Sequence, residues 1–204
     1  AGEVSTLAGN GEAGFADGQG EAARFNWPHG VALAANDEIV VADNENHAIR
    51  VVTPGGAVRT LAGNGEAGFA DGQGAAARFN KPAGLARDKD GSILVADRGN
   101  NAVRRVTMEG AVSTVAGNGE AGYADGEGAA ARFNWPVDVV VDKEGTILVA
   151  DCKHNRLRKI VGRQVTTLAG GSEAGTADGA GAGARFEKPY ALVLDERGRL
   201  LVAE

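Results

Sequence analysis

The side chains best suited to act as nucleophiles, bases or metal ligands are three histidines and one cysteine: His29, His47, His154 and Cys152. The three histidines occupy different positions of a repeating sequence, so they do not indicate a three-histidine metal site. Cys152 and His154 lie two residues apart, a spacing that could pair a thiolate with an imidazole. Side chains so close together at a strand end often point apart, however. We therefore predict no catalytic residue, no metal site and no cofactor.

Asp-Gly-x-Gly stretches in four long glycine-rich segments are the other candidates for chemistry, because carboxylate-rich loops bind calcium. These stretches lack the regular Asp/Asn spacing and the distal glutamate of a calcium loop, so calcium is kept as the alternative to a structural role. In every copy an arginine follows the aspartate seven residues later, which predicts loop-stapling pairs. The predicted pairs are Asp17–Arg24, Asp71–Arg78, Asp125–Arg132 and Asp178–Arg185.

These residues recur because the whole chain is repetitive. Residues 4–10 return as 58–64, as 112–118 and, less exactly, as 165–171. Four phenylalanines recur at intervals of 54, 54 and 53 residues. A fixed period of this length indicates stacked units, none of which buries its apolar face alone. We predict one domain over residues 1–204, with repeats at 4–57, 58–111, 112–164 and a shorter 165–204.

Within the second repeat, four short β-type segments are separated by Asp-Gly, Glu-Gly and Gly-Asn turns. They cover residues 83–86, 92–96, 102–107 and 111–115. Four short antiparallel strands per unit are typical of a β-propeller blade. The fold class is therefore all-β. In the long loop before each first strand, we expect a short helical stretch capped by Asp17 and its equivalents, with Phe25 and its equivalents filling the gap between blades.

The residues in the middle of each repeat resemble the NHL repeat, named for an Asn-His-Leu triplet. Residues 46–50 read Asn-His-Ala-Ile-Arg, and looser copies stand at 100–104 and 154–158. The resemblance covers essentially the whole chain. It implies a β-propeller, usually of six blades, used mostly to bind protein or RNA, with a few lyases and hydrolases among its relatives. It also implies a structural hydrogen-bonding role for His47.

Each blade has a first, a second, a third and an outer strand. If residues 3–8 form an outer strand, the chain contains four copies each of the first, second and outer strands but only three copies of the third strand. The fourth blade therefore lacks its third strand within this chain. We expect either a piece of a longer propeller or a chain that completes a ring with another copy of itself.

Residues that vary at the ends of the first strands and in the following turns are the candidates for recognition. Trp27, Lys81, Trp135 and Lys188 precede the proline of each repeat, and His29 and Tyr190 follow it. The full predicted set comprises Trp27, His29, Asn44, His47, Lys81, Arg98, Asn101, Trp135, Asp138, His154, Lys188 and Tyr190. Exposed aromatic rings are common anchors for partners. The alternative is that the tryptophans pack on the loop phenylalanine of a neighbouring blade.

The charges of the four long loops add up to −5, which predicts an acidic loop face, with the basic residues of the third strands toward the rim. The whole chain carries a formal charge of −6, which opposes binding to phosphate backbones. Apolar residues make up 43% of the chain, no apolar run approaches the roughly 18 residues of a membrane span, and no targeting segment is visible, so no compartment is assigned. The leading function is a non-enzymatic module that binds a protein or peptide. The alternatives are an RNA-binding propeller and a metal-assisted lyase or hydrolase.

Overall fold

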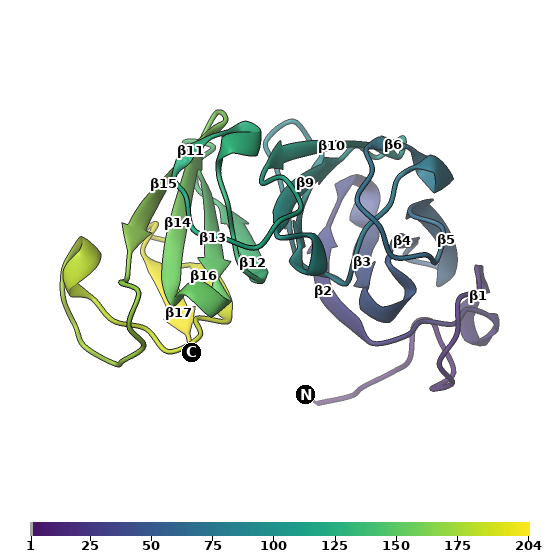
Figure 1. The fold of residues 1–204 in the computed structure, drawn as a ribbon. Helices are drawn as coiled ribbons and strands as arrows, with labels where there is room; N and C mark the ends of the chain where they lie inside the picture. Colours follow the sequence, from purple (N-terminus) through teal and green to yellow (C-terminus); the bar gives the residue numbers. More distant parts are fainter. Residues whose placement is uncertain (1) are drawn as a thin grey trace.

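Three large antiparallel sheets and one two-stranded sheet make up the structure (Figure 1). The computed structural model describes residues 2–204. The first sheet contains β2 (Pro28–Leu33), β3 (Ile39–Asp43), β4 (Ala48–Val52) and β5 (Ala57–Ala62). The second contains β7 (Pro82–Arg87), β8 (Ile93–Asp97), β9 (Ala102–Val106) and β10 (Ala111–Ala116). The third contains β12 (Pro136–Val141), β13 (Ile147–Asp151), β14 (Arg156–Val161) and β15 (Gln164–Ala169), and the last contains β16 (Ala191–Leu194) and β17 (Leu200–Ala203). The predicted all-β fold is confirmed, with three complete blades and a partial fourth.

The strands follow from short β-branched runs closed by residues that accept turn conformations. In the first blade, β4 and β5 are joined by a tight turn in which the N–H of Gly56 donates to the Thr53 carbonyl at 2.9 Å. Gly56 has a φ of 84°, which an L side chain rarely adopts. Gly110 has a φ of 89° at the same place in the second blade. The regular turns therefore reproduce the same antiparallel register in each copy.

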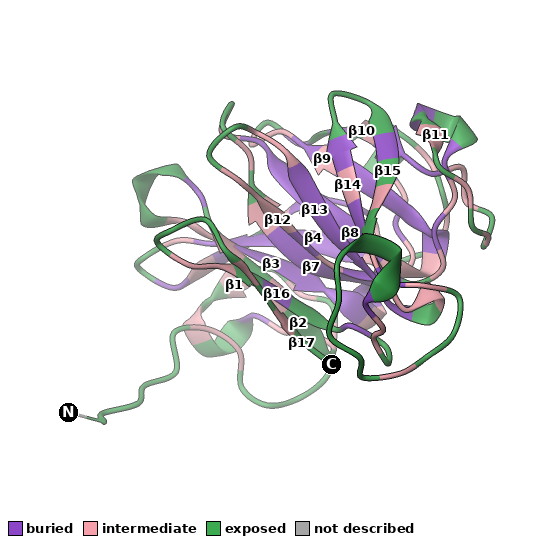
Figure 2. Cartoon of the chain, turned by 90° about the vertical axis from the view of Figure 1, so that its left-hand side faces the viewer, coloured by how far each residue is buried: buried purple, intermediate pink, exposed green. Residues whose placement is uncertain are grey.

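The core lies between neighbouring blades. The first strands β2, β7, β12 and β16 contact one another in sequence order. One apolar cluster combines Val40 and Ile49 of the first blade with Phe79 and Ile93 of the second. Phe79 and Phe133 are fully buried, which confirms that this loop ring fills the gap between blades at these two positions. Figure 2 shows the buried residues on the central strands and the exposed residues on loops and outer edges.

The long loop of each complete blade folds back on the outer strand of that blade. Two-residue strands β1 (Gly18–Gln19), β6 (Gly72–Gln73) and β11 (Gly126–Glu127) pair with β5, β10 and β15, respectively. Every helix described in residues 2–204 is a single 3-10 turn, and none is long and apolar enough to cross a membrane. These turns are η1 (Gly20–Ala22), η2 (Ala35–Asp37), η3 (Asn44–Asn46), η4 (Gly74–Ala76), η5 (Arg98–Asn100), η6 (Gly128–Ala130), η7 (Cys152–His154) and η8 (Gly181–Gly183).

The loop is anchored by a buried arginine of the third strand. Arg50 of β4 is fully buried, and its guanidinium donates to Asp43 at 2.7 Å and to Asp17 at 2.6 Å. The same group lies 4.9 Å from the centre of the Phe15 ring and 5.2 Å from that of Phe25. A buried charge is tolerated only when it is paired and hydrogen-bonded. Arg50 therefore fixes the loop over the sheet.

The second and third blades repeat this arrangement. Arg104 bonds Asp97 and Asp71, and Arg158 bonds Asp151 and Asp125, at 2.7–2.9 Å. All three arginines are buried, so the expectation that these third-strand bases lie toward the rim was wrong. They sit beneath the loops because the loop aspartates and strand-end aspartates converge on them.

The predicted loop pairs are not formed. Asp17 contacts Arg50 and Thr60, and Asp71 contacts Arg104 and Thr114. The arginines seven residues later bind glutamates earlier in the loop instead: Arg24 with Glu12, Arg78 with Glu66, Arg132 with Glu120 and Arg185 with Glu173. Asp178 is exposed. Asp17 also does not cap η1, because its carboxylate accepts the backbone N–H of Thr60 at 3.0 Å.

Residues 3–8, expected to form an outer strand, do not form one. Val4 is 93% exposed. An outer strand needs a neighbour to share backbone hydrogen bonds, and no strand within residues 2–204 pairs with this segment. The flank of the first blade is correspondingly open. Val31 of β2 is 65% exposed, whereas Leu85 and Val139 at the same repeat position are 8% and 0% exposed because a preceding blade covers them.

Candidate binding site at the channel mouth

The residue before each first strand has a left-handed backbone. The φ angles are 53° for Trp27, 53° for Lys81, 59° for Trp135 and 57° for Lys188. A left-handed conformation costs an L-residue about 1–2 kcal/mol, so the surroundings must hold it in place. This conformation presents four variable side chains beside the start of β2, β7, β12 and β16.

A hydrogen bond from the preceding blade holds three of these four residues. The backbone N–H of Lys81 donates to Nδ1 of His47 at 3.1 Å. Asn101 accepts the N–H of Trp135 at 3.0 Å through its side-chain oxygen, and Asn155 accepts that of Lys188 at 3.0 Å. The structural hydrogen-bonding role that the family resemblance implied for His47 is thus present as a bond between blades.

The first and fourth blades meet across the ends of the first strands. Nε2 of His29 lies 2.8 Å from the hydroxyl of Tyr190, and the two ring centroids are 5.8 Å apart. These residues are 161 positions apart in the sequence. Burial and the positive charge of Arg98 lower the pKa of His29, which favours its neutral form near pH 7. We call the region around this contact, where the four first strands begin, the channel mouth.

Trp135 is the aromatic centre of the channel mouth. Nζ of Lys153 lies 3.6 Å from the centre of its indole ring, and Cζ of Arg98 lies 5.1 Å from it. Both distances are within the range of cation–π contacts. Trp135 remains 41% exposed. Because the ring is fixed by cations and no Trp–Phe ring pair occurs within residues 2–204, the alternative of packing on a loop phenylalanine finds no support.

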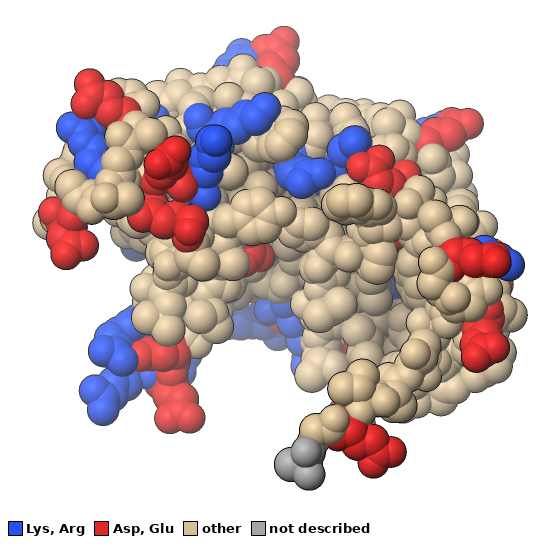
Figure 3. Space-filling view, turned by 90° about the horizontal axis from the view of Figure 1, so that it is seen from below, with Lys and Arg blue, Asp and Glu red and all other residues tan. Residues whose placement is uncertain are grey.

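The channel mouth is locally basic. Lys81 pairs with Glu45 at 2.9 Å, but Arg98, Lys153 and Lys188 have no ion-pair partner within residues 2–204. The sum of loop charges did not include the buried arginines, which neutralise three of the loop aspartates. Figure 3 shows basic and acidic side chains interspersed on the side viewed from below, with extensive uncharged surface between them.

Several predicted residues act within the fold. Asn44 is buried, and its amide donates to the Pro82 carbonyl at 2.8 Å. His154 contacts Asp151 through Nδ1 at 3.0 Å. Asp138 accepts the N–H of Leu192 at 2.8 Å. Burial raises the pKa of the Asp138 carboxyl, and this effect outweighs the hydrogen bond from Leu192, which lowers it. With His47 and Asn101, these side chains join blades or turns, so their surfaces are less available to a ligand.

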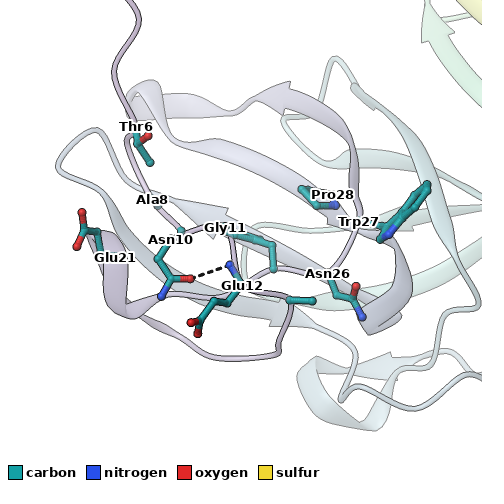
Figure 4. Close-up of a pocket in the computed structure, with 12 residues that line it drawn as sticks. Thr6, Ala8, Asn10, Gly11, Glu12, Glu21, Asn26, Trp27 and Pro28 are labelled. Carbon is teal, nitrogen blue, oxygen red and sulfur yellow. Dashed lines mark hydrogen bonds between the residues drawn. The ribbon is translucent and has the colours of Figure 1, made fainter.

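Trp27 lies apart from this group, at the edge of an open cavity on the flank of the first blade. The cavity has a volume of about 800 Å³ and is lined by residues that include Asn10, Glu12, Phe25 and Trp27. Figure 4 shows Trp27 at one side of this space and the hydrogen bond from the Glu12 N–H to the Asn10 side chain at the other. Trp27 is 77% exposed.

The reactive side chains that the sequence singles out are buried or already engaged. Cys152 is buried, and this burial raises the pKa of its thiol, which disfavours the nucleophilic thiolate. No group of three or more His, Cys, Asp or Glu side chains within residues 2–204 is arranged to hold a metal ion. The carboxylate of Asp17 is already engaged by Arg50 and Thr60. Calcium binding by this loop stays a prediction without support from its geometry.

Two further positions at the channel mouth lie in the turns that vary between repeats but outside the predicted set. Lys153 lies in a turn that varies between repeats, and it stacks on Trp135. Asn155 holds Lys188 in the same way that Asn101 holds Trp135. The signal for Asn155 was available, because it stands 54 residues after Asn101 and 108 after His47. Nothing in the sequence placed Lys153 beside Trp135.

Comparison with known proteins agrees with this architecture. The model of the NHL repeat matches residues 25–52, 79–105 and 133–160. Each match runs from the loop phenylalanine through the third strand of one complete blade.

Two protein relatives and one solved structure illustrate the range of similarity. The chain is 26% identical over 276 residues to the Arabidopsis thaliana protein named SUPPRESSOR OF QUENCHING 1, chloroplastic, with 98% of this chain and 26% of the relative aligned. It is 36% identical over 115 residues to human NHL repeat-containing protein 2, with 54% of this chain and 16% of the relative aligned. The chain thus spans about a quarter or less of either relative.

The solved structure is an auxiliary nutrient binding protein from Bacteroides thetaiotaomicron. It superposes with a TM-score of 0.71 at 18% identity, over 88% of this chain and 46% of the other. At this identity, the similarity concerns the fold alone. The three repeat matches and the three complete blades together show that the chain contains three NHL repeats and has a β-propeller fold.

Proposed function

We propose that the chain is a non-enzymatic binding module that recognises a protein or peptide at the channel mouth. The observation that carries this proposal is Trp135, a 41% exposed ring held in place by Lys153 and Arg98. Partly exposed tryptophans next to arginine are frequent centres of protein interfaces. Since the backbone of Trp135 is fixed by Asn101, binding would cost little ordering of this ring.

The structure also supports the use of several repeats at once. The His29–Tyr190 contact and the Trp135 stack bring side chains of all four repeats to one mouth. An extended peptide that crosses the mouth would contact residues from successive blades. The backbone N–H groups of Trp135 and Lys188 are held by asparagine side chains of the preceding blades rather than by a ligand, which is typical of a preformed site.

The test is retention of peptides from an unbiased immobilised library by the purified chain. Replacing Trp135 with alanine should remove most of the retention while the thermal unfolding midpoint stays close to that of the wild type. Lys89→Ala, in a turn at the opposite end of the strands, is the control and should retain the wild-type pattern. Equal retention by the wild type and the Trp135 variant would refute the proposal.

The open flank of the first blade favours a second kind of partner, another copy of this chain. Val31 and Leu33 are 65% and 64% exposed on one flank, and Val193 and Leu201 are 55% and 51% exposed on the other. Neighbouring blades bury the positions equivalent to Val31 and Leu201 elsewhere in the chain, as Leu85 and Leu94 show. Mass measurement in solution tests this idea, because a single species near 20.7 kDa at all concentrations would exclude self-association.

A further inference from the structure

Three cations at the channel mouth lack carboxylate partners among the described residues. Arg98 lies in η5 of the second blade, Lys153 in η7 of the third, and Lys188 just before β16 of the fourth. None of them forms an ion pair within residues 2–204, although Lys81 nearby is paired with Glu45 at 2.9 Å. In contrast, one glutamate and the aspartate in the long loop of each complete blade are matched by arginines.

These cations are held close together by the fold. Arg98 and Lys153 both lie on the Trp135 ring, at 5.1 and 3.6 Å from its centre. The backbone of Lys188 is fixed by Asn155. All three charges act on the buried thiol of Cys152, whose backbone N–H donates to the Trp135 carbonyl at 3.2 Å. The three side chains thus share one neighbourhood although they come from three repeats.

An unneutralised cluster of this kind favours an anionic ligand. Like charges within a Debye length of about 8 Å repel each other, and only a bound anion relieves that repulsion. The stack on Trp135 has already restricted Arg98 and Lys153, so less side-chain freedom remains to be lost on binding. Hydrogen bonds between a cation and a carboxylate are also stronger than those between neutral groups.

We propose that the ligand of the channel mouth is an acidic peptide segment, with carboxylates against Arg98, Lys153 and Lys188 and an apolar or aromatic side chain on Trp135. This inference rests on the proposed function, since it specifies the chemistry of the peptide. A short peptide fits better than a nucleic acid because the whole chain carries a formal charge of −6, which opposes binding of a long phosphate backbone.

The experiment compares two fluorescein-labelled octapeptides by fluorescence anisotropy at low and physiological salt. One contains four glutamates and one tyrosine, and the other has glutamine in place of every glutamate. The wild type should bind the glutamate peptide roughly tenfold or more tightly than the glutamine peptide, with weaker binding as salt increases. A labelled oligouridylate serves as the third probe and should bind weakly.

Variants assign the charge preference to this cluster. Lys153→Glu and Lys188→Glu should each weaken binding of the glutamate peptide by about tenfold or more. Lys89→Glu makes the same charge change at the other end of the strands and should leave binding near the wild-type value. Lys153→Met gives a second variant without charge reversal, and thermal unfolding checks that each protein is folded.

The outcomes separate the two proposals. If the wild type binds glutamate and glutamine peptides equally, the acidic-peptide inference is overturned while the binding module stands. If it retains no peptide from the unbiased library, the proposed function itself fails. Tighter binding of the oligouridylate than of either peptide would overturn the inference in favour of RNA.

Discussion

Replacing His47 with alanine should weaken the junction between the first and second blades, whereas replacing it with asparagine should not. His47 has a left-handed backbone with a φ of 51°, and its Nδ1 accepts the Lys81 N–H at 3.1 Å. Alanine would lose this acceptor and tolerate the backbone poorly. The two effects together amount to about 2 kcal/mol of unfolding free energy.

Asparagine provides a matched control within the chain itself. Asn101 and Asn155 stand at the same repeat position, with φ angles of 49° and 55°, and each accepts the equivalent backbone N–H. Asparagine also adopts the left-handed conformation more readily than most residues. The His47→Asn variant should therefore remain within about 0.5 kcal/mol of the wild type.

The dependence on pH separates this bond from general packing. Burial comes first among the causes that lower the pKa of His47 from 6.5, and the positive charge of Lys81 adds to it against the opposing charge of Glu45. The folded chain therefore prefers the neutral ring. Its contribution to stability is present above pH 6.5 and is lost as the pH falls below that value, because the unfolded chain binds the proton more readily.

Urea unfolding at pH 7.5 and pH 5.5 provides the assay. The wild type should lose more stability between these two values than the His47→Asn variant, because only the wild type has an acceptor that becomes protonated. The His47→Ala variant should be less stable at both. Equal destabilisation by alanine and asparagine, or equal pH dependence of the wild type and the asparagine variant, would refute this reasoning.

Three further predictions concern the blades. Phe79→Ala should cost about 3–5 kcal/mol because the ring is fully buried between blades, and a loss below about 1 kcal/mol in urea unfolding would contradict that placement. Arg104→Met should lower the unfolding free energy by about 3–5 kcal/mol because it leaves Asp97 buried without its cation. Arg132→Met breaks an exposed pair and should lower it by under about 1 kcal/mol. Similar losses for the two variants would count against this explanation. Burial raises the pKa of Asp71, but the hydrogen bonds from Arg104 and Thr114 outweigh it and lower the pKa from 3.8. The contribution of Asp71 to folding stability should therefore be present above pH 3.8 and be lost as the pH falls below it. If the Asp71→Asn variant unfolds in acid just as the wild type does, this role is excluded.

The blades could be predicted from the sequence because their signals are local. Alternating runs, turn residues and the regular spacing of Phe25, Phe79 and Phe133 depend on neighbours in the chain or on its period. The predicted strands of the second repeat lie within one or two residues of β7, β8, β9 and β10. Residues 3–8 carry the same pattern, but a pattern gives no strand where the structure offers no pairing partner.

The contacts between repeat positions could not be predicted from periodicity. In a repeating chain every spacing recurs, so the seven-residue interval of Asp17 and Arg24 is no more regular than the 33-residue interval of Asp17 and Arg50. Only the fold shows which interval is a contact. The same limit applies to His29 and Tyr190, which are brought together by the placement of the four first strands.

The fastening of one blade to the next has a consequence for how such a chain diversifies. At each junction the receiving residue contributes its backbone N–H to the hydrogen bond between blades, as Lys81, Trp135 and Lys188 show. A main-chain donor is indifferent to the side chain attached to it. Mutation can therefore exchange tryptophan for lysine at these positions of the channel mouth without loss of the hydrogen bond between blades. Assembly of the propeller and choice of binding partner can thus evolve separately.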